Sequence, residues 1–141
     1  MDKRPLYEIA APRYGIVKRE QMVAAGWSDS AIQRLVASGE LTLVHEGIYR
    51  FTAAIECTEQ KLMVAQEWCG REGYVSHRGA GCWYGLDGVP DGFVEVTARQ
   101  TWGRPPPPGV VVHFTRRLDI EDIRTFGQIR VGSPERTMIE L

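Results

Sequence analysis

A break at Gly26 separates two short segments whose apolar residues recur at helical spacing. The first segment, residues 19–25, ends where a helix-terminating glycine is favoured. After the break, Ser28 can cap a second helix, and Asp29 places a negative charge in its first turn. The apolar residues of this second helix fall at i, i+3 and i+4, the pattern of a buried stripe, and are Ile32, Leu35 and Val36. The pattern therefore predicts two helices joined by a short turn.

Two β-type segments, 41–44 and 48–51, follow the second helix, which ends at Gly39. They flank His45-Glu46-Gly47, and Gly47 supplies the permissive backbone that a hairpin turn needs. A helix, a turn, a second helix and a hairpin form the outline of a winged helix-turn-helix. This outline indicates a DNA-binding regulatory protein rather than an enzyme.

In a helix-turn-helix the N-terminal part of the second helix enters the major groove of DNA. The candidate contact residues on that helix are Ser28, Ser30, Gln33 and Arg34. Arginine can bridge guanine acceptors and glutamine can pair with adenine, whereas serine mostly contacts phosphate. Four further residues can reach phosphates, from the preceding helix and around the wing, and are Lys18, Arg19, His45 and Arg50. The alternative is an ordinary amphipathic helix with scattered surface charge, and Asp29 and Glu40 would repel phosphate nearby.

Charge gives this hypothesis only weak support. The chain has 141 residues, 43% of them hydrophobic and 25% charged, with a formal net charge of −1. Residues 1–51 hold seven Lys and Arg against six Asp and Glu, and residues 52–141 hold ten against twelve. Because DNA affinity depends on phosphate neutralisation, this slight asymmetry favours a local rather than a general basic surface.

The cysteines and the N-terminal segment indicate the cellular compartment of the protein. Cys57, Cys69 and Cys82 form an odd number without a CxxC pair, and the first residues lack the apolar core of a signal peptide. No apolar run approaches the roughly 20 residues that a membrane span needs. We expect a cytoplasmic protein with reduced thiols and no membrane association.

The second half predicts a small mixed domain, so the fold class is α+β with domains at 1–52 and 56–141. Helices are expected over 58–69 and 76–83, and strands over 93–97, 110–114 and 129–131. Pro105 to Pro108 favour an extended loop between two of the strands. Ser133-Pro134-Glu135 predicts a final helix start. That helix has room for about two turns, so either it closes the domain or the domain is truncated and belongs to a longer protein.

The same half holds residue types used in catalysis and metal binding. The set Cys57, Cys69, His77 and Cys82 matches no compact zinc spacing. Ser76-His77-Arg78 lacks an oriented acid, so Ser76 is expected to cap a helix beside a half-buried histidine. Glu95 lies in a strand similar to the acidic strand of restriction-like nucleases, but a threonine stands where lysine is expected. We therefore predict no catalytic residues, no metal and no cofactor.

Residues 15–51, GIVKREQMVAAGWSDSAIQRLVASGELTLVHEGIYRF, resemble the N-terminal winged-helix domain of the AbiEi antitoxin family. The shared pattern is a Gly-hydrophobic pair, an arginine, a short helix ending in A-G, a capped helix, G-x-L and a wing of hydrophobic-x-x-G-hydrophobic-Tyr. SHRGAGCWYGL (76–86), VEVT (94–97) and SPERTMIEL (133–141) resemble segments that follow that domain in the same group. The resemblance implies a DNA-binding antitoxin that represses its own operon. It also implies a nucleotidyltransferase-like partner toxin, in a type IV pair whose members need not form a stable complex.

The leading hypothesis is thus a transcriptional autorepressor and antitoxin that binds double-stranded operator DNA through residues 1–51. The second half would form a homodimer on an inverted repeat, or contact a toxin. A second hypothesis makes the winged helix a protein-interaction module that neutralises a toxin without reading DNA. A third, the least favoured, is a restriction-like nuclease dependent on Glu95.

Overall fold

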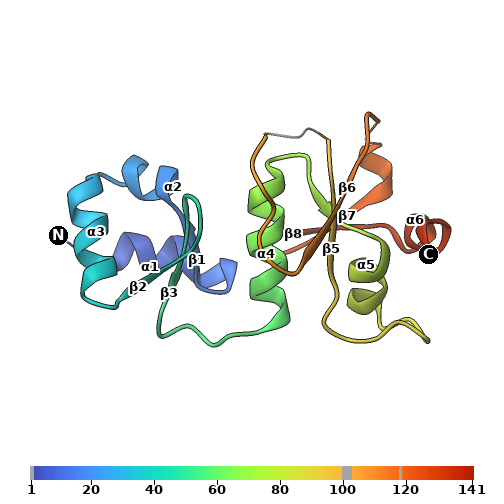
Figure 1. Ribbon diagram of the computed structural model, residues 1–141, viewed down its shortest axis with the longest axis horizontal. Helices are drawn as coiled ribbons and strands as arrows, with labels where there is room; N and C mark the ends of the chain where they lie inside the picture. Colours follow the sequence, from blue (N-terminus) through green and yellow to red (C-terminus); the bar gives the residue numbers. More distant parts are fainter. Residues whose placement is uncertain (1, 100–102, 118) are drawn as a thin grey trace. The chain divides into compact units, whose positions relative to one another are not determined.

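The computed structural model describes residues 2–99, 103–117 and 119–141. It divides into two compact units, Met1–Gln60 and Lys61–Leu141, called unit 1 and unit 2 below. Figure 1 shows helices and a small sheet in unit 1, and helices around a larger sheet in unit 2. The helix α4, Thr58–Cys69, begins in unit 1 and continues into unit 2. The predicted α+β class is confirmed.

Unit 1 has the predicted winged helix-turn-helix order. Its elements are α1 (Arg4–Ala10), η1 (Ala11–Arg13), β1 (Ile16–Lys18), α2 (Arg19–Ala24), α3 (Asp29–Ala37), β2 (Leu41–His45) and β3 (Ile48–Phe51). The strands form an antiparallel sheet in the order β1-β3-β2. Gly47 has a φ of 73° in the hairpin between β2 and β3, a conformation that glycine adopts without strain.

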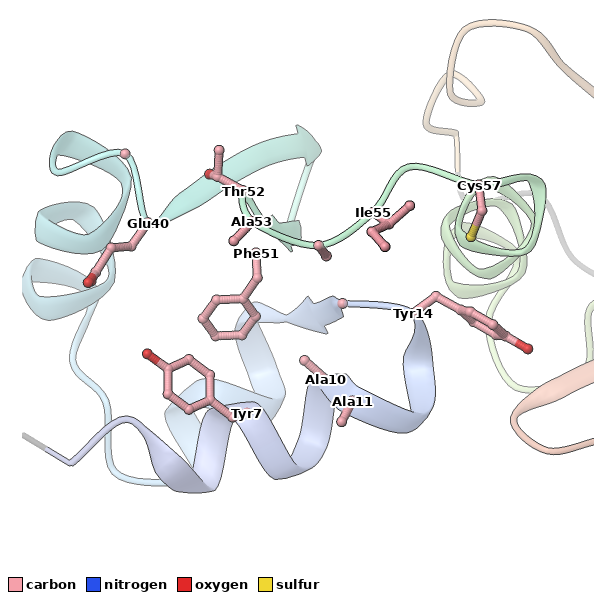
Figure 2. A pocket seen from close by; sticks show the side chains of 13 residues that line it. Tyr7, Ala10, Ala11, Tyr14, Glu40, Phe51, Thr52, Ala53, Ile55 and Cys57 are labelled. Carbon is pink, nitrogen blue, oxygen red and sulfur yellow. The ribbon is translucent and has the colours of Figure 1, made fainter.

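A groove of about 930 Å³ lies between α1, η1 and the segment that follows β3. The Tyr7 and Phe51 rings meet at its wall with centroids 5.1 Å apart, and Figure 2 shows both rings with Ile55 and Tyr14 further along. The lining is mostly apolar and includes none of the eight residues predicted to contact DNA. The groove is therefore separate from the predicted DNA-binding residues.

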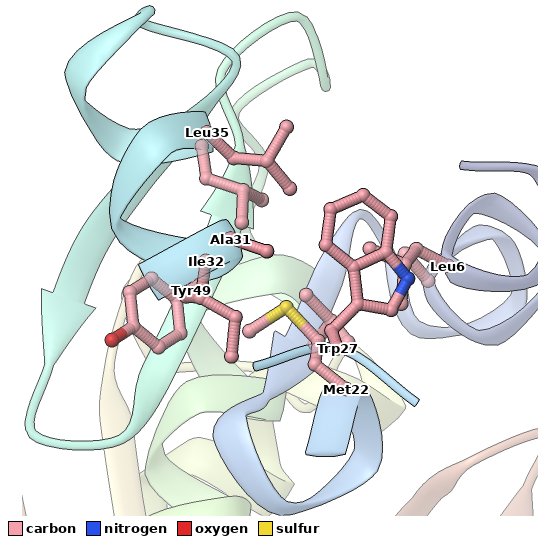
Figure 3. Packing of buried hydrophobic residues seen from close by; sticks show 10 residues of the cluster. Leu6, Met22, Trp27, Ala31, Ile32, Leu35 and Tyr49 are labelled. Atoms are coloured by element: carbon pink, nitrogen blue, oxygen red, sulfur yellow. The ribbon is translucent and has the colours of Figure 1, made fainter. Parts of the chain in front are cut away.

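The core of unit 1 holds the two helices of the helix-turn-helix together. Trp27, in the turn between α2 and α3, is 5% exposed. Figure 3 shows its ring between Leu6 of α1 and the side chains that α3 turns inward. Those α3 side chains are Ala31, Ile32 and Leu35. Trp27 therefore fixes the orientation of α3 relative to the rest of unit 1.

Unit 2 is built on a five-stranded mixed sheet. Its strands are β4 (Tyr74–Val75), β5 (Val94–Ala98), β6 (Val110–Phe114), β7 (Ile123–Phe126) and β8 (Ile129–Gly132), in the order β6-β5-β4-β8-β7. β5 runs parallel to β6, and β4 parallel to β8, while β4–β5 and β7–β8 are antiparallel. Strands β4 and β7 were not predicted. β4 has only two residues, and every side chain of β7 is at least partly exposed, so neither shows a period-two apolar pattern.

Helices cover both faces of this sheet. Figure 1 shows α4 on one side and α5 (His77–Tyr84) with α6 (Pro134–Glu140) on the other, and the short η2 (Ile120–Asp122) precedes β7. Ser133 caps α6 as predicted, because its Oγ accepts from the Arg136 N–H at 3.1 Å. No helix among the described residues has the length and apolar character to cross a membrane.

Gly79 lets α5 approach β5 closely. A Cβ added at Gly79 would lie 2.6 Å from the backbone oxygen of Glu95, a distance that forces the helix or the strand to move. Glycine inside a helix costs about 1 kcal/mol relative to alanine. Glycine is nevertheless required at this position, because a larger residue would prevent the close packing of α5 against β5.

Gly79→Ala is expected to lower the free energy of unfolding of unit 2 by about 1–2 kcal/mol, because overpacking outweighs the gain in helix propensity. Urea unfolding followed by far-UV circular dichroism measures the change. Gly81→Ala is the matched control, because its Cβ would meet the Val89 methyl groups at 3.1 and 3.2 Å, and side-chain tips can shift. Equal destabilisation by both substitutions would contradict this account of Gly79.

Candidate nucleic-acid interface

The candidate interface begins with the cap of α3. Ser28 has an extended backbone, with φ −81° and ψ 160°, and its Oγ accepts from the Ala31 N–H at 3.1 Å. The hydroxyl therefore stabilises the start of the helix, which is where a helix-turn-helix protein meets the groove. Ser28 remains exposed, so its hydroxyl hydrogen can still donate to an incoming acceptor.

The outward face of α3 is polar and exposed. The residues on it are Ser30, Gln33, Arg34 and Ala37. The opposite face is buried in the core of unit 1. Hence the structure brings Ser30, Gln33 and Arg34 onto one solvent-facing surface, together with the capping Ser28.

Arg34 differs from the other basic residues of unit 1. The other exposed or half-exposed cations pair with carboxylates, as Lys3–Glu40, Arg4–Asp2, Lys18–Glu20, Arg19–Asp29 and Arg50–Glu56. Arg13 is buried. Within the described part of unit 1, Arg34 is the exposed basic residue without an ion-pair partner. Its guanidinium can therefore bind a ligand without first breaking an ion pair.

Arg19 joins the starts of α2 and α3. Its Nε and Nη2 each lie 2.9 Å from an oxygen of Asp29, in a two-point pairing. This hydrogen bonding raises the pKa of Arg19 and lowers the pKa of Asp29, which favours the charged form of each group. The pairing neutralises the carboxylate of Asp29, which would otherwise repel an anion at the start of α3. Glu40, the other acidic residue near α3, is paired with Lys3 at 2.7 Å.

Lys18 and the wing residues occupy less open positions. Lys18 lies at the start of α2, and its Nζ is 2.7 Å from the Glu20 carboxylate. His45 is half-buried where the β2–β3 register shifts, next to the wing turn. The Arg50 side chain is 18% exposed, and its guanidinium contacts the Thr52 carbonyl and Glu56. Arg50 faces Ile16 and Thr42 within the sheet, away from the tip of the wing.

Unit 2 contains a second polar group that the sequence patterns did not predict. His77, Glu95 and His113 come together, with the two imidazole rings stacked at 3.7 Å. Burial would raise the pKa of Glu95, but hydrogen bonds from His113 and Arg78 outweigh it and lower that pKa. Burial lowers the pKa of His77, and the neighbouring His113 acts in the same direction. A spacing rule could not find this set, because its members lie on a helix and two strands.

One expectation about this region, the capping role of Ser76, is corrected. Ser76 stands at the N-cap of α5, but its side chain does not cap the helix and instead contacts His77 Nδ1 at 3.0 Å. His77 groups with Glu95 and His113 rather than with the cysteines. Cys69 is buried, which raises its pKa to about 12, and Cys82 Sγ donates to the Pro90 carbonyl.

Comparison with known families bears on unit 1. Residues 4–52 match a family model described as a transcriptional regulator, AbiEi antitoxin. This part of unit 1 is similar to the regulator domain of AbiEi antitoxins. The match runs from α1 to just beyond the wing, so it contains α3 and all eight predicted contact residues. The resemblance seen in the sequence is confirmed for this part of the chain. No curated protein matches the chain.

The AbiEi description names a regulator of transcription and an antitoxin, and no class of enzyme. It fits a helix-turn-helix whose second helix has a buried stripe and an outward polar face. The matched residues 4–52 are therefore the part of the chain to which the regulator description applies.

Proposed function

We propose that this chain is a sequence-specific, double-stranded DNA-binding autorepressor that acts as the antitoxin of a type IV pair. One observation carries the DNA-binding part, namely the exposed Arg34 on the polar face of α3 with no ion-pair partner among the described residues. A guanidinium on a recognition helix can make a bidentate contact to guanine O6 and N7. Gln33, its neighbour on the same helix, offers the amide that suits adenine.

Phosphate contacts would come from cations that are paired in the free protein. Exposed ion pairs contribute little, typically about 0–1 kcal/mol, so Lys18 and Arg19 can exchange carboxylate for phosphate at small cost. Ser28 and Ser30 supply hydroxyls beside them. His45 and Arg50 belong to the same proposal as wing residues, with Arg50 the less accessible of the two.

The test is a fluorescence-anisotropy titration of the full chain with a labelled duplex from upstream of its own gene. A scrambled duplex of equal length and composition is the reference. At moderate salt, specific binding is expected to be tighter by about a thousandfold or more. Equal affinity for the two duplexes would overturn the proposal.

Asp29→Asn is expected to increase affinity several-fold for both duplexes. The substitution removes a negative charge beside the recognition helix and releases Arg19 for phosphate. The dependence of log K on log salt should steepen by about 0.9, the contribution of one additional phosphate contact. A salt series with the wild type and the variant measures the slope.

Asp2→Asn is the control for Asp29→Asn, because it removes an exposed carboxylate that pairs with Arg4 and not with Arg19. Its affinity and salt slope should equal those of the wild type. Weaker DNA binding by Asp29→Asn would contradict a role for Arg19 at the phosphates.

The antitoxin role rests on the AbiEi match, and the partner is proposed to be a nucleotidyltransferase-like toxin. A homodimer on an inverted repeat would place two α3 helices one helical turn of DNA apart. Footprinting on the upstream duplex, with sedimentation of the complex, distinguishes one bound chain from two.

The mostly apolar groove of unit 1 favours a second candidate function, a protein-interaction module. Ile55 at its rim is 85% exposed. In that case toxin neutralisation would persist when both Gln33 and Arg34 are replaced by alanine. It would instead be lost in Ile55→Asp. Growth of cells that express toxin with each variant separates the two functions.

A further inference from the structure

Three residues far apart in the sequence meet on one face of the unit 2 sheet. Glu95 and Thr97 are two residues apart on β5, so their side chains share a face. His113 of the parallel β6 lies opposite Thr97. α5 packs on this face, as the close approach of Gly79 to the Glu95 backbone requires, and His77 is its first residue. The possible ligand atoms of His77, Glu95 and His113 all lie within 4.8 Å of one another.

We propose that unit 2 binds one divalent transition-metal ion through His77, Glu95 and His113. Two imidazoles with one carboxylate form a donor set that suits zinc and ferrous iron. Mg²⁺ and Ca²⁺ take mainly oxygen ligands, and this set has one carboxylate. Three protein ligands leave coordination positions open for an exogenous ligand. The inference concerns unit 2 and does not depend on DNA binding by α3.

The carboxylate is held in a fixed orientation. Glu95 is almost fully buried, and its Oε1 accepts from the backbone N–H of Arg78 at 3.1 Å and from Arg78 Nε at 3.0 Å. The Arg78 guanidinium lies over the Phe93 ring, 4.3 Å from its centroid. These contacts direct Oε2 towards His113 Nε2, 2.5 Å away. Oε2 is therefore the oxygen that would bind the ion, while Oε1 keeps its contacts with Arg78.

The His77 ring is also positioned by a chain of hydroxyl groups. Thr97 Oγ1 donates to Ser76 Oγ at 2.7 Å, and Ser76 Oγ lies 3.0 Å from His77 Nδ1. When Nδ1–H donates to Ser76, the lone pair is on Nε2, and metal-binding histidines are commonly oriented in this way. Ser76 and Thr97 are both buried. Ser76 is thus a positioning residue for the proposed site.

The backbone at His77 has a φ of 51°, in the left-handed region that non-glycine residues rarely adopt. The His77 and His113 rings stack at 3.7 Å with an angle of 13° between their planes. Parallel rings do not point their lone pairs at a common centre. Binding therefore requires one ring to turn and His113 Nε2 to exchange its Glu95 contact for the ion.

The test uses the full chain freed of metal and titrated with Zn²⁺ by calorimetry, then with Co²⁺ in the visible range. One equivalent of Zn²⁺ is expected to bind. Co²⁺ should give d–d bands without thiolate charge-transfer bands, since no cysteine belongs to the set. Imidazole ¹⁵N spectra of the Zn²⁺ form should show shifts for His77 and His113 and none for His45.

Removing a ligand should cost more than the tenfold to hundredfold loss of affinity typical of outer-shell changes. His113→Ala and Glu95→Gln are therefore each expected to weaken Zn²⁺ binding by more than about a hundredfold, and Ser76→Ala by about tenfold to a hundredfold. His45→Ala replaces the third histidine of the chain, in unit 1, and should keep the wild-type affinity for Zn²⁺. The double variant Cys57→Ser, Cys82→Ser is the control for thiols and should keep it too.

Two results would overturn the proposal. One is the absence of Zn²⁺ binding by the folded wild type at millimolar metal, which leaves the cluster as a hydrogen-bonded group of the core. The other is binding that persists in both His113→Ala and Glu95→Gln. If a variant fails to fold by circular dichroism, the ¹⁵N spectra of the wild type decide, because they need no substitution.

Discussion

Replacement of Trp27 by alanine is expected to unfold unit 1 in large part and to abolish specific DNA binding. The ring is 5% exposed and packs between α1 and the inward side chains of α3. Truncation of a buried tryptophan typically costs about 3–5 kcal/mol. Stability scales at roughly 0.05–0.15 kcal/mol per residue, so a unit of this size has only a few kcal/mol to lose.

Two-dimensional amide NMR measures the effect of Trp27→Ala by residue. Signals of residues in unit 1 should collapse towards unfolded positions, while those of unit 2 keep their dispersion. Val23→Ala is the control, because Val23 is an exposed apolar residue of α2 and its truncation should change stability by less than about 0.5 kcal/mol. A dispersed unit 1 spectrum in Trp27→Ala would contradict the central place given to this ring.

Arg34→Ala is expected to weaken binding to the upstream duplex by about 1–3 kcal/mol, the usual value of a bidentate arginine–guanine contact. Binding to the scrambled duplex should change much less. The difference arises because a base contact discriminates between sequences, whereas a phosphate contact does not. Anisotropy titrations with both duplexes at one salt concentration measure the ratio.

Arg34→Lys separates charge from geometry. Lysine keeps the positive charge but lacks the planar fork, so discrimination between the duplexes should fall while binding to the scrambled duplex stays near the wild type. Arg4→Ala is the control, since Arg4 is exposed and paired with Asp2. Equal losses on both duplexes in Arg34→Ala would make Arg34 a phosphate contact, and no loss would contradict the insertion of α3 in the groove.

Local signals in the sequence were enough for most of unit 1. The Ser28 cap and the stripe of Ile32, Leu35 and Val36 depend on neighbours within a turn of helix, and α3 follows them closely. Gly47 likewise predicts the β2–β3 hairpin from the local sequence alone. The Arg19–Asp29 pairing was not predicted, because it joins the starts of two helices and requires their packing to be known.

Unit 2 was less predictable because its important contacts are long-range. The helices expected over 58–69 and after Ser133 are both present, and the second is predicted by its cap, its proline and its acidic first turn. The cluster of His77, Glu95 and His113 depends on α5 lying over the paired β5 and β6, which no sequence spacing encodes. Ser76 was misjudged for the same reason, because its hydroxyl turns to His77 and Thr97 rather than to the helix start.

All five side chains of β5 are buried, and the strand has β4 on one side and β6 on the other. Opening β5 would expose both of its faces and break two ladders of hydrogen bonds. Segments shielded in this way are commonly among the last to exchange amide hydrogens with solvent. Local opening of an edge strand such as β7 therefore leaves β5 paired with its neighbours. Glu95 of β5 keeps its position while the edge strands of the sheet open and close.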